Sequence, residues 1–196
     1  MPKIGMQPIR SSALIDAVIA EIGQSGTMDV TVSQIAKRAG MSTALAHHYF
    51  GSKNSMFVAA MRHILKLFGA EIRQNLDGET DPLKRLEIII QTSFSDANMH
   101  HETVAAWLNF YVFAQKSDDV ARLLKVYHTR LQSNLRHELR QLTPKNAATI
   151  AEGIAALIDG SYIRWVLRNG KDAPEHPERI ALDYLHMSLA KYRTSK

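Results

Sequence analysis

The chain contains no cysteine among its 196 residues, and this absence excludes a small secreted scaffold that depends on disulfides. It also lacks a long hydrophobic run: no stretch approaches the ~18 consecutive apolar residues of a membrane-spanning helix. Residues 1–12 carry none of the apolar core of a signal peptide. We therefore expect a cytoplasmic protein that does not interact with a membrane.

Sequence signatures of catalysis are absent as well. There is no G-x-S-x-G, no phosphate-binding loop and no H-E-x-x-H. His100, His101 and Glu102 follow one another directly, but adjacent residues do not face one another on a helix, and no fourth metal ligand accompanies them. We expect no catalytic site, no cofactor and no metal, so the chain is predicted not to be an enzyme.

Helical periodicity fills nearly the whole chain. Hydrophobic residues make up 45% and charged residues 22%, as in ordinary globular proteins, and no strand-like alternation is found. Long helices are expected at about 11–25, 53–76, 83–97, 102–115, 119–142, 144–169 and 175–193. With two short helices inside residues 31–50, this pattern predicts an all-α fold of about nine helices. Pro2, Gly5 and Pro8 interrupt a helix, so residues 1–9 are expected to form an arm.

Residues 31–53, TVSQIAKRAGMSTALAHHYFGSK, contain two short helical patterns separated by Gly40. The apolar positions of the first pattern lie at i, i+3, i+4 and i+7; they are Val32, Ile35, Ala36 and Ala39. Thr31 and Ser42 precede the two patterns, where their hydroxyls can accept a backbone N–H and cap each helix. Gly40 is expected to end the first helix in a left-handed conformation. Two short helices joined by such a turn predict a helix-turn-helix, whose second helix enters the major groove of DNA.

The second helix of this motif has an apolar and a polar face. Ala46 and Phe50 are expected to face inward at i and i+4. The outward side chains are small or polar, as suits a surface that enters a groove; they are Thr43, Ala44 and His47, flanked by His48. Tyr49 and Lys53 follow at the end of the helix, where both could reach phosphates. A helix–glycine–helix corner also occurs as plain packing in helical proteins, so a purely structural interpretation stays open at this point.

The basic charge is concentrated in the first third of the chain. The formal net charge is +5 and the sequence pI is about 9.5. Residues 1–68 hold seven Lys and Arg against three Asp and Glu, a net charge of +4, whereas residues 69–196 have a net charge of +1. This distribution favours a polyanion as the partner of the helix-turn-helix, although a solvated basic face is about equally common for a charge of this size.

The string T-V-x-x-I-A-x-x-A-G-M-S-x-A-x-x-x-H-Y-F-x-x-K, which begins at Thr31, resembles the DNA-binding signature of TetR-type transcriptional repressors. The opening M-P-K-I-G-M-Q-x-I-R resembles the start of one subgroup, the choline-responsive (BetI-type) repressors of glycine-betaine synthesis genes. The resemblance implies a DNA-binding domain at 8–68, with its motif at 31–50, and a ligand-binding and dimerisation domain at 69–196. It also implies a homodimer formed through the last two helices. The family usually has a larger aliphatic residue at the position of Ala46.

The resemblance further implies which residues bind double-stranded operator DNA. The first residues of the recognition helix would read base edges, and Tyr49 and Lys53 would hold the backbone. The complete set of predicted DNA-binding residues is Thr31, Ser33, Gln34, Lys37, Ser42, Thr43, Ala44, His47, His48, Tyr49 and Lys53.

Aromatic residues gather on later helices, where they could enclose a small cation. A quaternary ammonium has no N–H donor and is held by aromatic faces and a nearby carboxylate, each face contributing about 0.5–2 kcal/mol. Asp159 lies one turn from Tyr162, and an unpaired carboxylate in so apolar a helix would be costly. The predicted ligand-binding residues are Phe94, Trp107, Tyr111, Tyr127, Asp159, Tyr162 and Trp165. Aromatic residues at helical spacing more often form core packing, which is the alternative interpretation.

Three functions are compatible with these patterns. The first is a dimeric repressor that binds operator DNA and responds to choline or a related quaternary ammonium. The second is a TetR-type repressor that responds to another lipophilic cation or an apolar metabolite. The third is an all-α enzyme or interaction module in which the helix-turn-helix is only structural.

Overall fold

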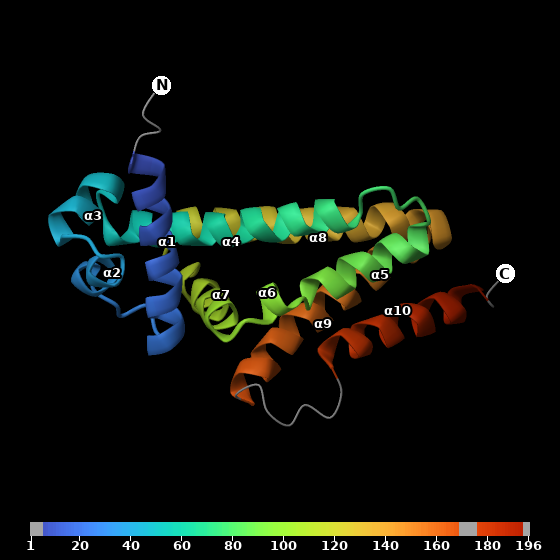
Figure 1. The fold of residues 1–196 in the computed structure, drawn as a ribbon. Coiled ribbons are helices and arrows are strands. Elements are labelled where there is room, and N and C mark those ends of the chain that lie inside the picture. The colour runs from blue at the N-terminus through green and yellow to red at the C-terminus, as the bar shows by residue number, and fades with distance from the viewer. Residues whose placement is uncertain (1–5, 169–175, 194–196) are drawn as a thin grey trace, which may run out of the picture. The chain divides into compact units, whose positions relative to one another are not determined.

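The computed structural model describes residues 6–168 and 176–193, which form helices joined by turns (Figure 1). The helices are α1 (Met6–Ser25), α2 (Val32–Arg38), α3 (Thr43–Phe50), α4 (Lys53–Asn75), α5 (Pro82–Ser93), α6 (Asp96–Met99), α7 (His101–Phe113), α8 (Asp118–Leu142), α9 (Ala147–Leu167) and α10 (Pro177–Arg193). No strand occurs within the described ranges. The all-α prediction is confirmed: the nine expected helices are present there, and the four-residue helix α6 adds to them.

The helices form two compact units. The first unit contains the described residues up to Lys66 together with His101–Leu123. The second contains Leu67–His100 together with the described residues from Leu124 onward. Helices α4 and α8 each contribute residues to both units. The first unit therefore includes α7, which the two-domain prediction places within residues 69–196.

Helix α1 supplies much of the core of the first unit. Its predicted apolar stripe is buried and consists of Leu14, Ala17, Val18 and Ile22. It packs against α2, α3 and, most extensively, α7. Gly23 permits this close packing, because a Cβ added there would lie 2.5 Å from the Cα of Glu102 at the start of α7. Helix α1 ends as predicted, before Gly26, whose φ is 66°.

Helix α1 begins earlier than the sequence predicts. It starts at Met6, so residues 6–9 of the expected arm are helical. Pro8 is the third residue of the helix, and proline is tolerated in a first turn because the N–H groups there have no intrahelical acceptor. Residues 1–5 of the expected arm lie outside the described residues.

The single helix predicted over 83–97 is divided in the structure. Helix α5 ends at Ser93, and a two-residue break separates it from α6. Phe94 leaves the helix with φ −111° and ψ 17°. The side-chain amide of Asn98 donates to the carbonyl oxygen of Thr92 at 2.8 Å, which satisfies an acceptor at the end of α5. The prediction was wrong here because no proline or glycine marks the break.

Two later boundaries also differ from the prediction. Helix α9 begins at Ala147 rather than at 144. Pro144 lies in the preceding turn, where the N–H of Asn146 donates to the carbonyl oxygen of Thr143 at 3.1 Å. Helix α10 begins at Pro177, and the expected start at 175 lies outside the described residues.

Helices α5, α9 and α10 pack together in the second unit. Glu138, which is 3% exposed, is paired with Arg85 at an Nε–Oε1 distance of 2.8 Å. Gly153 allows α9 and α10 to approach closely, because an added Cβ would overlap the ring of Tyr184.

Over the part of the chain that the structure describes, no helix combines the length and apolar composition needed to cross a membrane.

Candidate functional site

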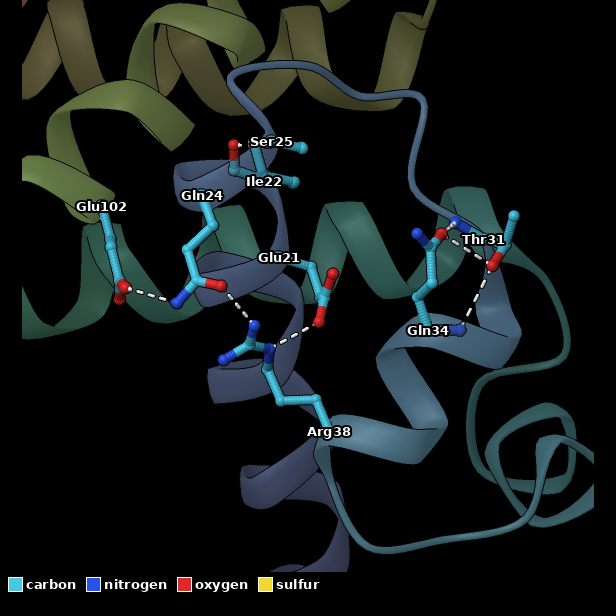
Figure 2. A network of polar contacts seen from close by, with 8 residues as sticks. All are labelled: Glu21, Ile22, Gln24, Ser25, Thr31, Gln34, Arg38 and Glu102. Atoms are coloured by element: carbon cyan, nitrogen blue, oxygen red, sulfur yellow. Dashed lines mark hydrogen bonds and ion pairs between the residues drawn. The ribbon is translucent and has the colours of Figure 1, made fainter.

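Helix α2 begins with a capping box. The Oγ1 of Thr31 accepts from the backbone N–H of Gln34 at 3.2 Å. In return, the Oε1 of Gln34 accepts from the backbone N–H of Thr31 at 2.7 Å. The two side chains thus satisfy two N–H groups that the helix itself leaves unpaired. The predicted cap is confirmed, and Figure 2 shows both residues turned toward each other.

The turn between α2 and α3 has the predicted left-handed glycine. Gly40 has a φ of 66°. Its N–H donates to the carbonyl oxygen of Lys37 at 3.1 Å, and the N–H of Met41 donates to that of Ala36 at 2.8 Å. This pair of bonds is a Schellman motif, which fixes the angle at which the chain leaves α2.

Helix α3 presents the polar face that the sequence predicts. Ser42 caps it by accepting the backbone N–H of Leu45 at 3.2 Å. Ala46 is fully buried, so the smaller side chain at this position still faces the core. The predicted groove-facing residues of α3 are exposed; they are Thr43, Ala44, His47 and His48.

Three of the predicted residues make contacts near the end of α3. The Nδ1 of His47 lies 3.0 Å from the carbonyl oxygen of Gly51. Tyr49 is half-buried and packs edge-on against His48, with ring centroids 5.7 Å apart. The ammonium of Lys53 lies 5.4 Å above the ring centroid of Phe57, a cation–π contact at the start of α4.

The structure brings the predicted DNA-binding residues together on one segment, α2 to the start of α4, within the first unit. Ser33 and Lys37 are exposed on α2. Thr31, Gln34 and Ser42 are already engaged in capping. For these three, the local structure provides a capping role. Contact with DNA stays a prediction for the whole set.

Sequence reasoning did not single out Arg38, which lies next to Lys37. Its Nε donates to the carboxylate of Glu21 on α1 at 2.6 Å. A second guanidinium nitrogen donates to the side-chain oxygen of Gln24, also on α1. Figure 2 shows that this side chain crosses from α2 to α1. No periodicity in the sequence indicates such a contact, because it depends on how two helices cross.

The predicted ligand-binding residues are divided between the two units. Trp107 and Tyr111 lie on α7 in the first unit, with ring centroids 5.6 Å apart in an edge-to-face arrangement. Trp107 is buried and Tyr111 is half-buried. The remaining residues belong to the second unit; they are Phe94, Tyr127, Asp159, Tyr162 and Trp165.

In the second unit, the buried Tyr162 of α9 makes both an aromatic and a polar contact. Its ring centroid is 6.0 Å from that of Phe94. Its hydroxyl donates to the carbonyl oxygen of Ser93. Burial raises the pKa of Tyr162, and the nearby carboxylates of Asp159 and Glu71 raise it further. Both carboxylates therefore act electrostatically on this buried ring.

A second aromatic pair lies in the same unit. Tyr127 of α8 and Phe68 of α4 have ring centroids 5.8 Å apart. Beside Tyr127, the Nε2 of His128 lies 3.6 Å from the carboxylate of Asp159. The predicted ligand-binding set did not include Phe68 and Glu71; their spacing of one turn on α4 is the signal that could have identified them. Trp165 is half-buried on α9.

Comparison with known proteins adds family information. Residues 82–190 match the family model described as BetI-type transcriptional repressor, C-terminal, and residues 14–60 match that of bacterial regulatory proteins, tetR family. The HTH-type transcriptional regulator BetI of Brucella suis biovar 1 is 51% identical over 193 residues, which cover 97% of this chain and 96% of that protein. The regulator of the same description from Agrobacterium fabrum is 45% identical, covering 98% and 94%.

Solved structures agree in fold. A transcriptional regulator from Rhodococcus sp. Rha1 has a TM-score of 0.82 at 23% identity, covering 92% of this chain and 96% of that one. A transcriptional regulator from Saccharomonospora viridis in complex with choline has a TM-score of 0.76 at 21% identity, covering 90% and 95%. Given the family models and the full-length relatives, this chain belongs to the TetR family of transcriptional regulators and is a repressor of the BetI type.

Proposed function

We propose that this repressor binds operator DNA as a homodimer through α3 and releases it when choline or a related quaternary ammonium binds to the second unit. The observation that carries the DNA-binding part is the face of α3. Its exposed Thr43, Ala44 and His47 lie opposite the fully buried Ala46 on a helix capped at its start. A short, capped helix with small outward side chains suits the major groove.

A homodimer would place two such helices on successive major grooves, about 34–36 Å apart. Helices α9 and α10 are the proposed interface. They expose large apolar side chains, namely Ile163, Leu167, Ile180 and Met187. Residues 163 and 167 share a face at i, i+4, as do 180 and 187 at i, i+7. Apolar surface of this kind is typical of an interface between copies of a chain.

The second unit offers the chemistry that a quaternary ammonium needs. Phe94 and Tyr162 form one aromatic pair, and Phe68 and Tyr127 form another. Asp159 supplies the carboxylate. The BetI relatives and the choline complex of the S. viridis regulator support choline as the effector. Trp107 and Tyr111 were also predicted to take part, but they lie on α7 in the first unit and are not part of the proposed site.

Helix α4 is the proposed mechanical link, because it begins at Lys53 in the first unit and ends at Asn75 in the second. A ligand can weaken DNA binding only if it prefers one state of the dimer over another. The preferred state must be the one in which the spacing of the two α3 helices does not fit the operator. We infer that the cation stabilises that state through the second unit. A different lipophilic cation or an apolar metabolite would act by the same coupling.

The DNA-binding part is tested with an operator selected from random duplexes by the wild-type protein. Replacing Tyr49 and Lys53 by Ala should weaken binding to all sequences about equally. It should also make the dependence of log K on log salt shallower by about 0.9 for each phosphate that the variant no longer neutralises. A Gln115→Ala variant, at an exposed residue of the first unit outside the predicted DNA-binding set, provides the control, in which no charge changes. Unchanged affinity of the Tyr49 and Lys53 variants at moderate salt would favour an interaction module whose helix-turn-helix is only structural.

A further inference from the structure

Arg38 is a basic residue of the helix-turn-helix whose side chain is directed toward α1 (Figure 2). Its guanidinium binds Glu21 and Gln24 on α1, and its side chain is 34% exposed. Lys37, its neighbour, is exposed. The planar guanidinium uses two different donors for two partners, an arrangement that a lysine ammonium does not reproduce. Both residues are exposed, but one of the two adjacent cations is already paired with side chains of α1.

The amide of Gln24 extends this contact toward α7. Its oxygen accepts from Arg38, and its nitrogen lies 3.4 Å from the carboxylate of Glu102 (Figure 2). The amide is thus oriented between a cation and an anion, and reversing it would place donor against donor and acceptor against acceptor. The backbone contact between Gly23 and Glu102 lies one residue away. The start of α7, α1 and the end of α2 are consequently joined by one continuous set of contacts.

We propose that Arg38 is a positioning residue for operator recognition, and that Glu21, Gln24 and the first turn of α7 hold it in place. Helix α2 has seven residues, too few to be stable alone. Its orientation must come from its neighbours, and the capped turn at Gly40 transmits that orientation to α3. Arg38 therefore sets the angle at which α3 meets the groove and does not itself touch DNA.

The direction in which Glu21→Gln changes DNA affinity separates a positioning role from simple electrostatics. Replacing Glu21 by Gln removes a negative charge from a DNA-binding unit, so charge alone predicts tighter binding to DNA. The positioning role predicts weaker binding, by about five- to ten-fold, because Arg38 loses its charged partner. Asp118→Asn is the matched control, since it removes the same charge from an exposed position of the first unit.

Arg38→Gln and Lys37→Gln form a second matched pair. Both remove one positive charge. Lys37→Gln should make the dependence of log K on log salt shallower by about 0.9 for each protomer. Arg38→Gln should lower operator affinity with the wild-type salt dependence, a combination that a phosphate contact does not produce. Gly23→Ala should weaken operator binding because the added Cβ pushes α7 away from α1. Gly69→Ala is its control, because an added Cβ there meets only the flexible end of Arg73.

These affinities are measured on the selected operator, with circular dichroism to confirm that each dimer is folded at the assay temperature. The proposal is overturned if Glu21→Gln binds as tightly as wild type or tighter. It is also overturned if Arg38→Gln shows the shallow salt dependence of Lys37→Gln, or if Gly23→Ala binds like Gly69→Ala. It rests on operator binding by α3, and failure of the wild-type protein to select any duplex would instead contradict that function.

Discussion

The Nδ1 of His47 lies 3.0 Å from the carbonyl oxygen of Gly51, at the end of the helix on which His47 resides. A carbonyl oxygen can only accept, so Nδ1 must carry the proton of this bond. In the neutral ring, Nε2 is then an acceptor. The contact with Gly51 therefore determines which hydrogen-bonding group His47 can present to a base.

This relationship predicts the kind of base that His47 contacts. An acceptor in the major groove matches the amino group of adenine or cytosine. We expect His47→Ala to reduce discrimination at one base pair by about 1–3 kcal/mol and to leave the other positions unchanged. Competition with duplexes that carry all four base pairs at each operator position measures this. A loss spread evenly over all positions would show that His47 does not contact a base.

The left-handed turn at Gly40 predicts a stability effect. Gly40 and Gly160 both have open space for a Cβ, but only Gly40 has a positive φ. Gly40→Ala should lower the free energy of unfolding by about 1–2 kcal/mol, whereas Gly160→Ala should raise it slightly because alanine favours a helix. Denaturation curves of the two variants provide the comparison. Equal values would mean that the turn relaxes without strain.

The apolar faces of α9 and α10 predict which substitutions disrupt the proposed dimer. Leu167 is 78% exposed and Met187 is 67% exposed. In the proposed dimer interface, a glutamate at either position would bury a charge, so we expect Leu167→Glu and Met187→Glu to shift the protein toward monomer. Leu67→Glu, at another exposed apolar residue, is the control. Sedimentation velocity over a range of concentrations would refute the proposed interface if all three variants stayed dimeric.

Local features of the fold were predictable from the sequence because they depend on neighbouring residues. The cap at Thr31, the positive φ of Gly40 and the cap at Ser42 all rest on contacts within five residues, and all three are confirmed. The start of α1 was missed because Pro8 reads as an interruption although a first turn tolerates it. The end of α5 was missed because Asn98 supplies the terminating bond from beyond the break.

Contacts between distant helices could not be predicted in the same way. Arg38 reaches α1 only because α1 and α2 cross at that point. Glu71 and Asp159 both act on Tyr162 although 88 residues separate the two carboxylates along the chain. Hydrophobic periodicity shows which face of a helix is buried, but it does not show which helix covers that face.

The most direct test of the central claim is a titration of labelled operator complex with choline chloride, with sodium chloride at the same concentrations as the control. The control is needed because salt alone weakens protein–DNA contacts. Wild-type protein and Asp159→Asn should bind operator equally well without choline. We expect choline to release wild-type protein beyond the effect of sodium chloride, and the Asp159→Asn variant to require about ten times more choline, or ~1.4 kcal/mol. Release that is identical in the two salts, with no calorimetric heat of choline binding, would contradict the account.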